Sequence, residues 1–247
     1  MKYVTKFETQ TAYTSAESSL ILPNVSLIAE TNVVAYKQVE PAPSHDFVEI
    51  GGIKWATMNV GATGVTDYGL FFQWGDTQGY TAAQVGSGSG QKYFGWSDYK
   101  YWTADTGSGS SGMTKYNSTD GKTVLDASDD AVTAAWGGSW RIPTANEFLA
   151  LTAATNSSWV TDYQGSGING TLFTDKTDSS KVLFFPAAGR CGRGSVGSVG
   201  GEGNYWSSSL NTNGVTYGHY LGFGSSSVTV SYNYRYRGYS VRGVLGS

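Results

Sequence analysis

Apolar and polar residues alternate along the C-terminal stretch of this chain, from residue 205 to residue 244. Leu221 and Phe223 are two positions apart, and so are Val228 and Val230, which is the spacing of side chains on one face of a β-strand. The pattern predicts two strands that turn these four side chains toward a core. Small and polar residues fill the positions between them, so the other face of each strand is expected to be open to solvent.

The predicted outer face is rich in Tyr, Ser, Gly, Asn and Arg, which are residue types that antibody binding sites favour. This composition favours a surface that binds a ligand over one that carries out catalysis. We expect the following residues to be mostly exposed and to form a single ligand-binding face: Thr216, Tyr217, Tyr220, Gly222, Gly224, Thr229, Ser231, Tyr232, Asn233, Tyr234, Tyr236 and Arg237.

This region also lacks a set of residue types. Lys, Glu, Gln, Met and Trp account for 35 of the first 206 residues, but none occurs from Ser207 to Ser247. At the earlier frequency about 7 would be expected, and the chance of finding none is roughly one in two thousand, so the composition changes here. A codon with random first and second bases and a fixed third cytosine cannot encode these five types. The alternative is a strand region that simply avoids long side chains.

The segment from residue 46 onward has the mixed periodicity of an α+β domain. Residues 47–61 are expected to form a hairpin that turns at two adjacent glycines, and 68–76 and 136–140 to form aromatic strands. The sequence at 144–147 has the spacing of a capping box, which predicts a helix that begins there. We expect two or more helices around a twisted, mainly antiparallel sheet.

Residues 1–45 are expected to form a small N-terminal α+β module and its linker. The segment 2–7 alternates as a short strand, a helix is predicted up to Leu20, and 24–38 has the pattern of two more strands. Two prolines mark the linker. A unit this small holds little core of its own, so we expect it to pack on the main domain or on another protein.

Four segments of the main domain resemble a known family. They are WGGSWRIPTANEF at 136–148, FFPAAGR at 184–190, NYWSSSLNT at 204–212 and GYSVRGV at 238–244. In this order they resemble the C-type-lectin-fold variable proteins of diversity-generating retroelements in Bacteroides-type bacteria and their phages. They also resemble the broader bacterial domain related to formylglycine-generating enzymes. The resemblance implies a C-type-lectin-like domain over 46–247, with a variable region at about 205–244.

In that family, adenine-directed copying from a template repeat changes chiefly Asn codons near the C-terminus, which would produce the missing residue types described above. The resemblance therefore implies a diversified ligand-binding protein, expected to be a phage receptor-binding or tail component that attaches to a protein or glycan on a bacterial surface. A bacterial cell-surface adhesin of the same fold is the alternative. The N-terminal module is then expected to contact other virion proteins, and both a monomer and a symmetric trimer fit the sequence.

Catalysis and cofactors are not expected. Formylglycine-generating relatives use a pair of cysteines, whereas Cys191 is alone in this chain. The neighbouring cations Arg190 and Arg193 would favour a reactive thiolate, but no base partner is apparent, so a structural cysteine is the preferred interpretation. His45 falls in the linker and His219 beside a predicted strand, and neither belongs to a known catalytic motif.

One carboxylate cluster, Asp126, Asp129 and Asp130, has the oxygen chemistry that suits calcium. Its spacing matches no EF-hand loop, and acidic residues at the start of a helix are favoured by the helix dipole alone. No metal is therefore predicted. The Glu-Pro-Asn and Gln-Pro-Asp motifs of calcium-dependent lectins do not occur in the sequence.

Three tryptophans in Gly-rich segments suggest either a sugar-binding platform or core positions, and their strand context favours the core. The residues expected to be largely buried are Trp136, Trp140, Trp206, Leu221, Phe223, Val228 and Val230. Arg242 is expected to be paired or stacked.

Composition excludes some partners. The net charge of -3 and the 14% content of charged residues argue against nucleic acid. No run of 18 apolar residues suits membrane insertion, and the first ten residues lack the apolar segment of a secretory signal. The expected location is the virion or the extracellular surface.

Overall fold

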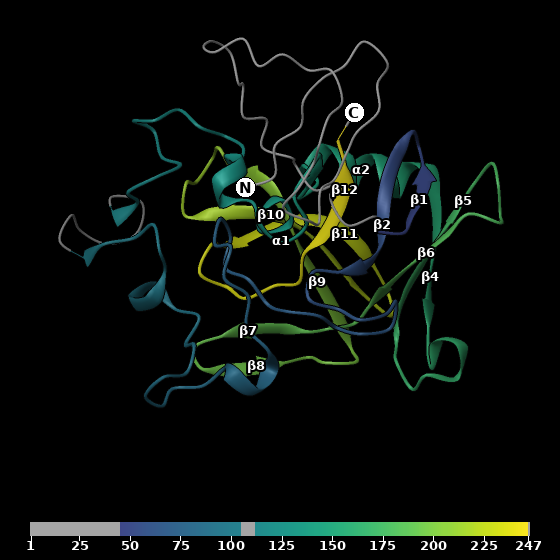
Figure 1. The fold of residues 1–247 in the computed structure, drawn as a ribbon, viewed down its shortest axis with the longest axis horizontal. Coiled ribbons are helices and arrows are strands. Elements are labelled where there is room, and N and C mark those ends of the chain that lie inside the picture. Colours follow the sequence, from purple (N-terminus) through teal and green to yellow (C-terminus); the bar gives the residue numbers. More distant parts are fainter. Residues whose placement is uncertain (1–44, 105–111, 247) are drawn as a thin grey trace, which may run out of the picture. The chain divides into compact units, whose positions relative to one another are not determined.

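The computed structural model describes residues 45–104 and 112–246. They belong to a unit that runs from Pro43 to Ser247. The expected N-terminal module at 1–40 lies outside the described residues. The described part has mixed α+β structure, with mostly antiparallel strands in several small sheets and two short α-helices (Figure 1). The single sheet predicted from the sequence is thus divided, because glycine-rich turns and irregular segments interrupt the strands.

The first and last strands of the described chain lie in one sheet. Its strand order is β1 (Phe47–Ile50), β2 (Ile53–Asn59), β12 (Arg242–Leu245) and β3 (Trp140–Arg141). Figure 1 shows β12, near the yellow end of the chain, beside β2. The hairpin predicted at 47–61 is confirmed, and its two turn glycines have φ of 60° and 76°, a conformation that favours glycine.

The remaining strands form three small antiparallel sheets. The first has the order β11 (Val228–Tyr234), β10 (Tyr217–Gly224) and β9 (Glu202–Leu210). The second has the order β4 (Thr155–Val160), β5 (Gly170–Asp175) and β6 (Val182–Pro186). The third is the pair β7 (Arg190–Gly192) and β8 (Ser195–Gly197).

The longer helix, α2 (Ala145–Ala154), begins at the predicted capping box. The Thr144 side chain accepts a hydrogen bond from the backbone N–H of Glu147, and the Glu147 carboxylate accepts one from the backbone N–H of Thr144. Arg141 in β3 donates to the same carboxylate through both terminal nitrogens. The helix start is therefore tied to the terminal sheet by a bidentate ion pair.

The prediction of aromatic strands was wrong for two segments. Trp136 is the last residue of helix α1 (Ala131–Trp136), because Gly137 at φ 68° ends the helix, and the strand that follows is only Trp140–Arg141. The segment 68–76 pairs only at single bridges of Phe71 and Phe72, between turns made by glycines with positive φ. Both segments still bury their aromatic side chains.

The main core lies between the β9–β10–β11 sheet, helix α2 and the sheet of β4, β5 and β6. Leu221 and Phe223 are buried in it against Phe148 and Leu151 of α2, which confirms the predicted strand register. The predicted burial of Trp136, Trp140 and Trp206 is also confirmed. Val228 and Val230 pack on the core but are only half-buried, because β11 is the edge strand of its sheet.

Arg242 is completely buried at the junction of β12, β2 and β6. Its Nε donates to Asn59 Oδ1 at 2.9 Å, and its terminal nitrogens donate to the carbonyls of Ala56 at 3.0 Å and Phe184 at 3.2 Å. The guanidinium also stacks over the Phe185 ring at 4.3 Å. Burial lowers the pKa of Arg242 to about 10. The prediction that this side chain is stacked or paired is confirmed, although its partners are neutral.

Truncation of Phe223 to Ala should lower the free energy of unfolding by about 3–5 kcal/mol, because it leaves a cavity beside Tyr205 and Phe185. Urea unfolding followed by circular dichroism measures the change. The control is Leu149→Ala on the exposed side of α2, expected to change stability by less than about 0.5 kcal/mol. Equal stability of the two variants would contradict the core assignment.

Replacement of Arg242 by Met should cost about 3 kcal/mol, because it leaves the acceptors on Asn59, Ala56 and Phe184 buried without a donor. The midpoint of urea unfolding reports the loss. Arg193→Met removes an exposed arginine and serves as the control. An Arg242 variant as stable as this control would show that the buried hydrogen bonds contribute little.

Candidate functional site

The β10–β11 hairpin distributes the predicted binding residues over two faces instead of one. Tyr220 lies opposite Ser231 and Gly222 opposite Thr229, whereas Tyr217 lies opposite Tyr234. Successive residues of a strand point to opposite faces, so the two kinds of pair cannot share a face. We call the face that points away from Leu221 the outer face. The predicted residues on it are Tyr220, Gly222, Gly224, Thr229, Ser231 and Asn233.

The expectation of exposure was correct for only part of the set. Thr229, Tyr232 and Tyr234 are exposed, and most of the others are half-buried. Thr216, Gly222 and Tyr236 are buried. Thr216 and Tyr236 lie just outside the strands, where the chain folds back onto the domain. Gly222 is covered by the Tyr220 ring, which passes 2.8 Å from the point where a Cβ would lie.

An open groove of about 410 Å³ lies along the outer face. Predicted residues that line it are Tyr220, Gly222, Gly224 and Thr229. The turn 225–227 adds three serines, and Asn204 on β9 and Arg190 on β7 complete the wall with their neighbours. A groove of this size falls in the range of about 300–1,000 Å³ that small-molecule sites occupy. Four of the twelve predicted residues thus line this groove.

The Tyr220 side chain is held in place by two other rings. Its centroid lies 4.9 Å from that of Tyr239 and 6.2 Å from that of Trp206. Trp206 is fixed in turn by a hydrogen bond from its Nε1 to the carbonyl of Phe72 at 2.8 Å. These contacts make Tyr220 a rigid aromatic wall of the groove rather than a freely rotating side chain.

Charged side chains stand at one end of the groove. Arg190 forms an ion pair with Glu202, and both side chains are nearly half exposed. Asn204 is 5% exposed, and its Nδ2 donates to the carbonyl of Gly189 at 3.3 Å. The groove thus offers a fixed amide and a solvent-accessible ion pair beside the Tyr220 ring.

The other predicted tyrosines form a second surface, the tyrosine patch, which consists of Tyr217, Tyr232, Tyr234, Tyr236 and Trp96. Tyr234 stacks on Tyr217 at 4.8 Å and on Tyr236 at 5.4 Å. Tyr232 is 54% exposed, and Tyr234 is 37% exposed. None of its five residues is charged, although the Arg237 guanidinium lies 5.4 Å from the Tyr236 ring. Exposed rings of this kind suit contact with another apolar surface.

Sequence analysis missed Arg235, which is fully buried between the two faces. Its Nε donates to the Tyr99 hydroxyl at 2.7 Å, and its Nη atoms donate to the carbonyls of Val215 at 2.9 Å and Lys115 at 3.0 Å. Its guanidinium also lies 4.7 Å from the ring of Trp74. The period-two pattern gave no signal for this burial, because Arg235 shares the parity of the outer-face residues and lies one residue beyond the end of β11.

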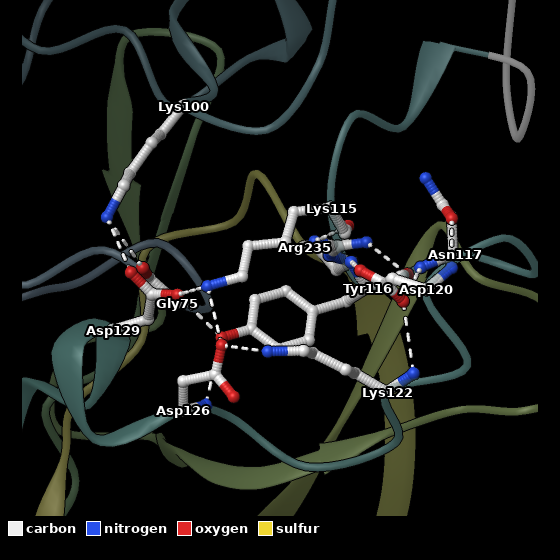
Figure 2. Close-up of polar contacts among 10 residues, drawn as sticks. All are labelled: Gly75, Lys100, Lys115, Tyr116, Asn117, Asp120, Lys122, Asp126, Asp129 and Arg235. Atoms are coloured by element: carbon white, nitrogen blue, oxygen red, sulfur yellow. Dashed lines mark hydrogen bonds and ion pairs between the residues drawn. The ribbon is translucent and has the colours of Figure 1, made fainter.

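The carboxylate cluster considered for calcium is occupied by cations of the chain itself. Figure 2 shows Lys100 and Lys115 directed at Asp129, which also accepts a hydrogen bond from the Tyr116 hydroxyl at 2.6 Å. Asp126 pairs with Lys115 at 2.7 Å and with Lys122 at 2.6 Å. Across residues 45–104 and 112–246, no group of His, Cys, Asp or Glu has the arrangement to hold a metal ion.

The third carboxylate of the cluster, Asp130, has the structural role that the helix dipole predicts. It accepts hydrogen bonds from the backbone N–H groups of Val132 and Thr133 at the start of α1, and from Ile142 at 2.8 Å. Burial raises the pKa of Asp130, and these hydrogen bonds oppose the shift. It is therefore an N-cap that also ties α1 to the β3 segment.

Cys191 is completely buried beside Phe71, Phe94 and Ala188. Burial raises the pKa of its thiol to about 12. This burial agrees with the preferred interpretation of a structural cysteine, and the raised pKa opposes the thiolate that the flanking arginines would favour. The residue is a packing element.

The Asp129→Asn substitution should lower the free energy of unfolding at pH 7 by about 2–3 kcal/mol, because it leaves Lys115 without this carboxylate partner. Burial opposes ionisation of Asp129, but hydrogen bonds from Lys115, Tyr101 and Tyr116 outweigh it and hold the pKa well below the usual range. Because the pKa is lower in the folded state, the ionised carboxylate stabilises the protein above the unfolded-state pKa of about 4. This stabilisation is lost progressively as the pH falls from there toward the folded-state pKa.

The difference between wild type and Asp129→Asn should therefore narrow below about pH 4, as measured by urea unfolding at several pH values. Glu49→Gln removes an exposed carboxylate of β1 that forms no ion pair within the described residues, and is the control. A gap that stays constant down to pH 3 would contradict the role assigned to the Asp129 charge.

Within the two described ranges, neither α-helix has the length and hydropathy needed to cross a membrane. Comparisons with protein-family models, with curated proteins and with solved structures found no match to this chain.

Proposed function

We propose that this chain is a diversified ligand-binding protein, a receptor-binding component of a phage that attaches to a bacterial surface through the outer-face groove. One observation carries the proposal. Eight of the twelve residues that line the groove come from 220–229, inside the stretch that lacks Lys, Glu, Gln, Met and Trp. The composition shift and the concavity therefore coincide.

A diversified site needs positions that accept many side chains and a scaffold that accepts few. In this stretch the scaffold residues Leu221, Phe223 and Arg235 are buried and make close contacts, where even one added methylene is felt. Thr229 is exposed, and a Cβ on Gly224 would meet only the Gly201 carbonyl at 3.5 Å, an ordinary contact. These two groove positions can therefore change without disturbing the core.

We further propose a C-type-lectin-like fold for the unit Pro43–Ser247, as the family resemblance implies. The mixed α+β architecture is compatible with it. Each of the four resembling segments also supplies buried residues, among them Phe148, Phe185, Trp206 and Arg242. Shared core positions are what a common fold requires. The N-terminal module would then contact other virion proteins, and the location would be the virion or the extracellular surface.

A groove-filling variant tests the site. Thr229→Trp places a large ring at an exposed lining position, so it should leave the melting temperature within about 2 °C of wild type. Staining of a panel of Bacteroides strains by fluorescently labelled protein, read by flow cytometry, should fall at least about tenfold, which corresponds to about 1.4 kcal/mol of binding free energy.

Two variants accompany this test. Leu149→Trp adds the same ring on the exposed side of α2 and should leave staining unchanged. Tyr232→Ser removes the most exposed ring of the tyrosine patch. If Tyr232→Ser abolishes staining and Thr229→Trp does not, the binding site is the tyrosine patch and not the groove.

Diversification has a separate test at the nucleotide level. The encoding genome should contain a second near-copy of the 3′ end of this gene beside a reverse-transcriptase reading frame, with differences at template adenines. Neighbouring phage structural genes would support the receptor-binding role, whereas a bacterial surface-protein locus would support an adhesin. A genome without the near-copy would remove diversification from the proposal.

A further inference from the structure

The chemistry of the groove points to the class of its ligand. Apart from the Tyr220 ring and the edge of Phe223, its lining side chains are polar: three serines at 225–227, Thr229, Asn204 and an ion pair. Hydroxyl, amide and charged groups around one aromatic wall match a ligand that carries many hydroxyls and one apolar face. A sugar ring has these properties, and the side chain of an apolar protein ligand does not.

A second cation, Arg237, lies against β7, with its guanidinium 5.4 Å from the Tyr236 ring. Arg237 is half-buried, and its Nε is buried with no hydrogen-bond partner in the described part of the chain. Its Nη1 lies 2.1 Å from the point where a Cβ of Gly192 would be, so the guanidinium occupies the space above that glycine. Any other residue at 192 would displace it.

The position above Gly192 places Arg237 next to Arg190. Arg190 and Gly192 are alternate residues of β7, and Cys191 between them points into the core. Alternate residues share a face and are about 7 Å apart along a strand. The Arg237 guanidinium over Gly192 and the Arg190 side chain therefore share one face of β7.

Both arginines also interact electrostatically with the Tyr239 hydroxyl. Burial and the neighbouring Tyr220 raise the pKa of the Tyr239 hydroxyl, and Arg237 and Arg190 both oppose the shift. The Tyr239 ring also contacts the Tyr220 ring that walls the groove. The positive field of the two arginines thus reaches the end of the groove at Tyr220.

We infer that the groove binds an acidic saccharide, with its anionic group held between Arg190 and Arg237 and its hydroxyls facing Asn204, Tyr220 and the serine turn. This inference rests on the proposed function of the same groove and names its ligand class. Glu202 lies at the rim as the partner of Arg190 and opposes an anion there. Its charge is balanced by Arg190, whereas Arg237 forms no ion pair with a carboxylate among the described residues and lies over the Tyr236 ring.

The test is isothermal titration calorimetry of the full chain with defined oligosaccharides. The acidic probes are oligogalacturonate and hyaluronan fragments, which carry carboxylates, and heparan fragments, which also carry sulfates. Maltooligosaccharides of equal length are the neutral probe. At least one acidic probe should bind about tenfold more tightly than the neutral one, and the preference should weaken in 0.5 M NaCl. Carboxylated and sulfated arms show which anion the arginines prefer.

Arg237→Gln should abolish the preference for the acidic probe, and Arg193→Gln, which removes an exposed arginine of the same β7–β8 hairpin, should leave it intact. Glu202→Gln should strengthen binding of the acidic probe severalfold, a gain that a purely structural role would not produce. Equal binding of acidic and neutral probes, or no binding of any acidic probe, would overturn the inference.

The two proposals fail in different ways. If Thr229→Trp blocks attachment to cells while acidic and neutral saccharides bind alike, the groove is the receptor site and the ligand class is wrong. If Thr229→Trp leaves attachment to cells unchanged, the proposed function of the groove itself is wrong, whatever the saccharides do.

Discussion

Two buried guanidinium groups hold the C-terminal stretch in place, and the groove depends on them. Arg242 and Arg235 are both fully buried, and most of their acceptors are backbone carbonyls of segments far away in the sequence. Neither forms an ion pair with a carboxylate in the described part of the chain. A fork of fixed donors can satisfy several carbonyls at once, which Lys cannot do. The irregular segments are thus joined without a long regular sheet.

The two buried arginines explain how the ends of the C-terminal stretch stay fixed where the strands stop. Arg235 fastens the chain just beyond β11 to the segment around Lys115, and Arg242 fastens β12 to β2 and β6. Between them, Leu221 and Phe223 anchor β10 on the main core. The backbone of β10 and β11 is therefore fixed from beneath by the core and at its C-terminal end by Arg235, while exposed outer-face side chains such as Thr229 make few contacts of their own.

Much of this architecture could be predicted from the sequence where the signal was local. The period-two pattern located Leu221 and Phe223, and the capping box located the start of α2. The same pattern separates Tyr217 from Tyr220, because odd and even positions of a strand lie on different faces, and the prediction of a single face was wrong because it mixed the two. Arg235 and the Lys partners of Asp129 were missed, because such pairs join residues that are more than ten positions apart.

The pleat of β10 has a consequence for how this surface can evolve. Even-numbered positions from 218 to 224 lie on the outer face, and odd-numbered positions belong to the core or to the tyrosine patch. Residues that face the groove and residues that hold the strand on the core are thus interleaved in β10. A Cβ on Gly218 would lie 2.6 Å from the buried Trp74 ring, whereas Gly224 and Thr229 have room for other side chains. A new ligand can therefore select changes at the groove end of the hairpin while Leu221 and Phe223 continue to hold the strand on the core, so adaptation and foldability need not compete for the same codons there.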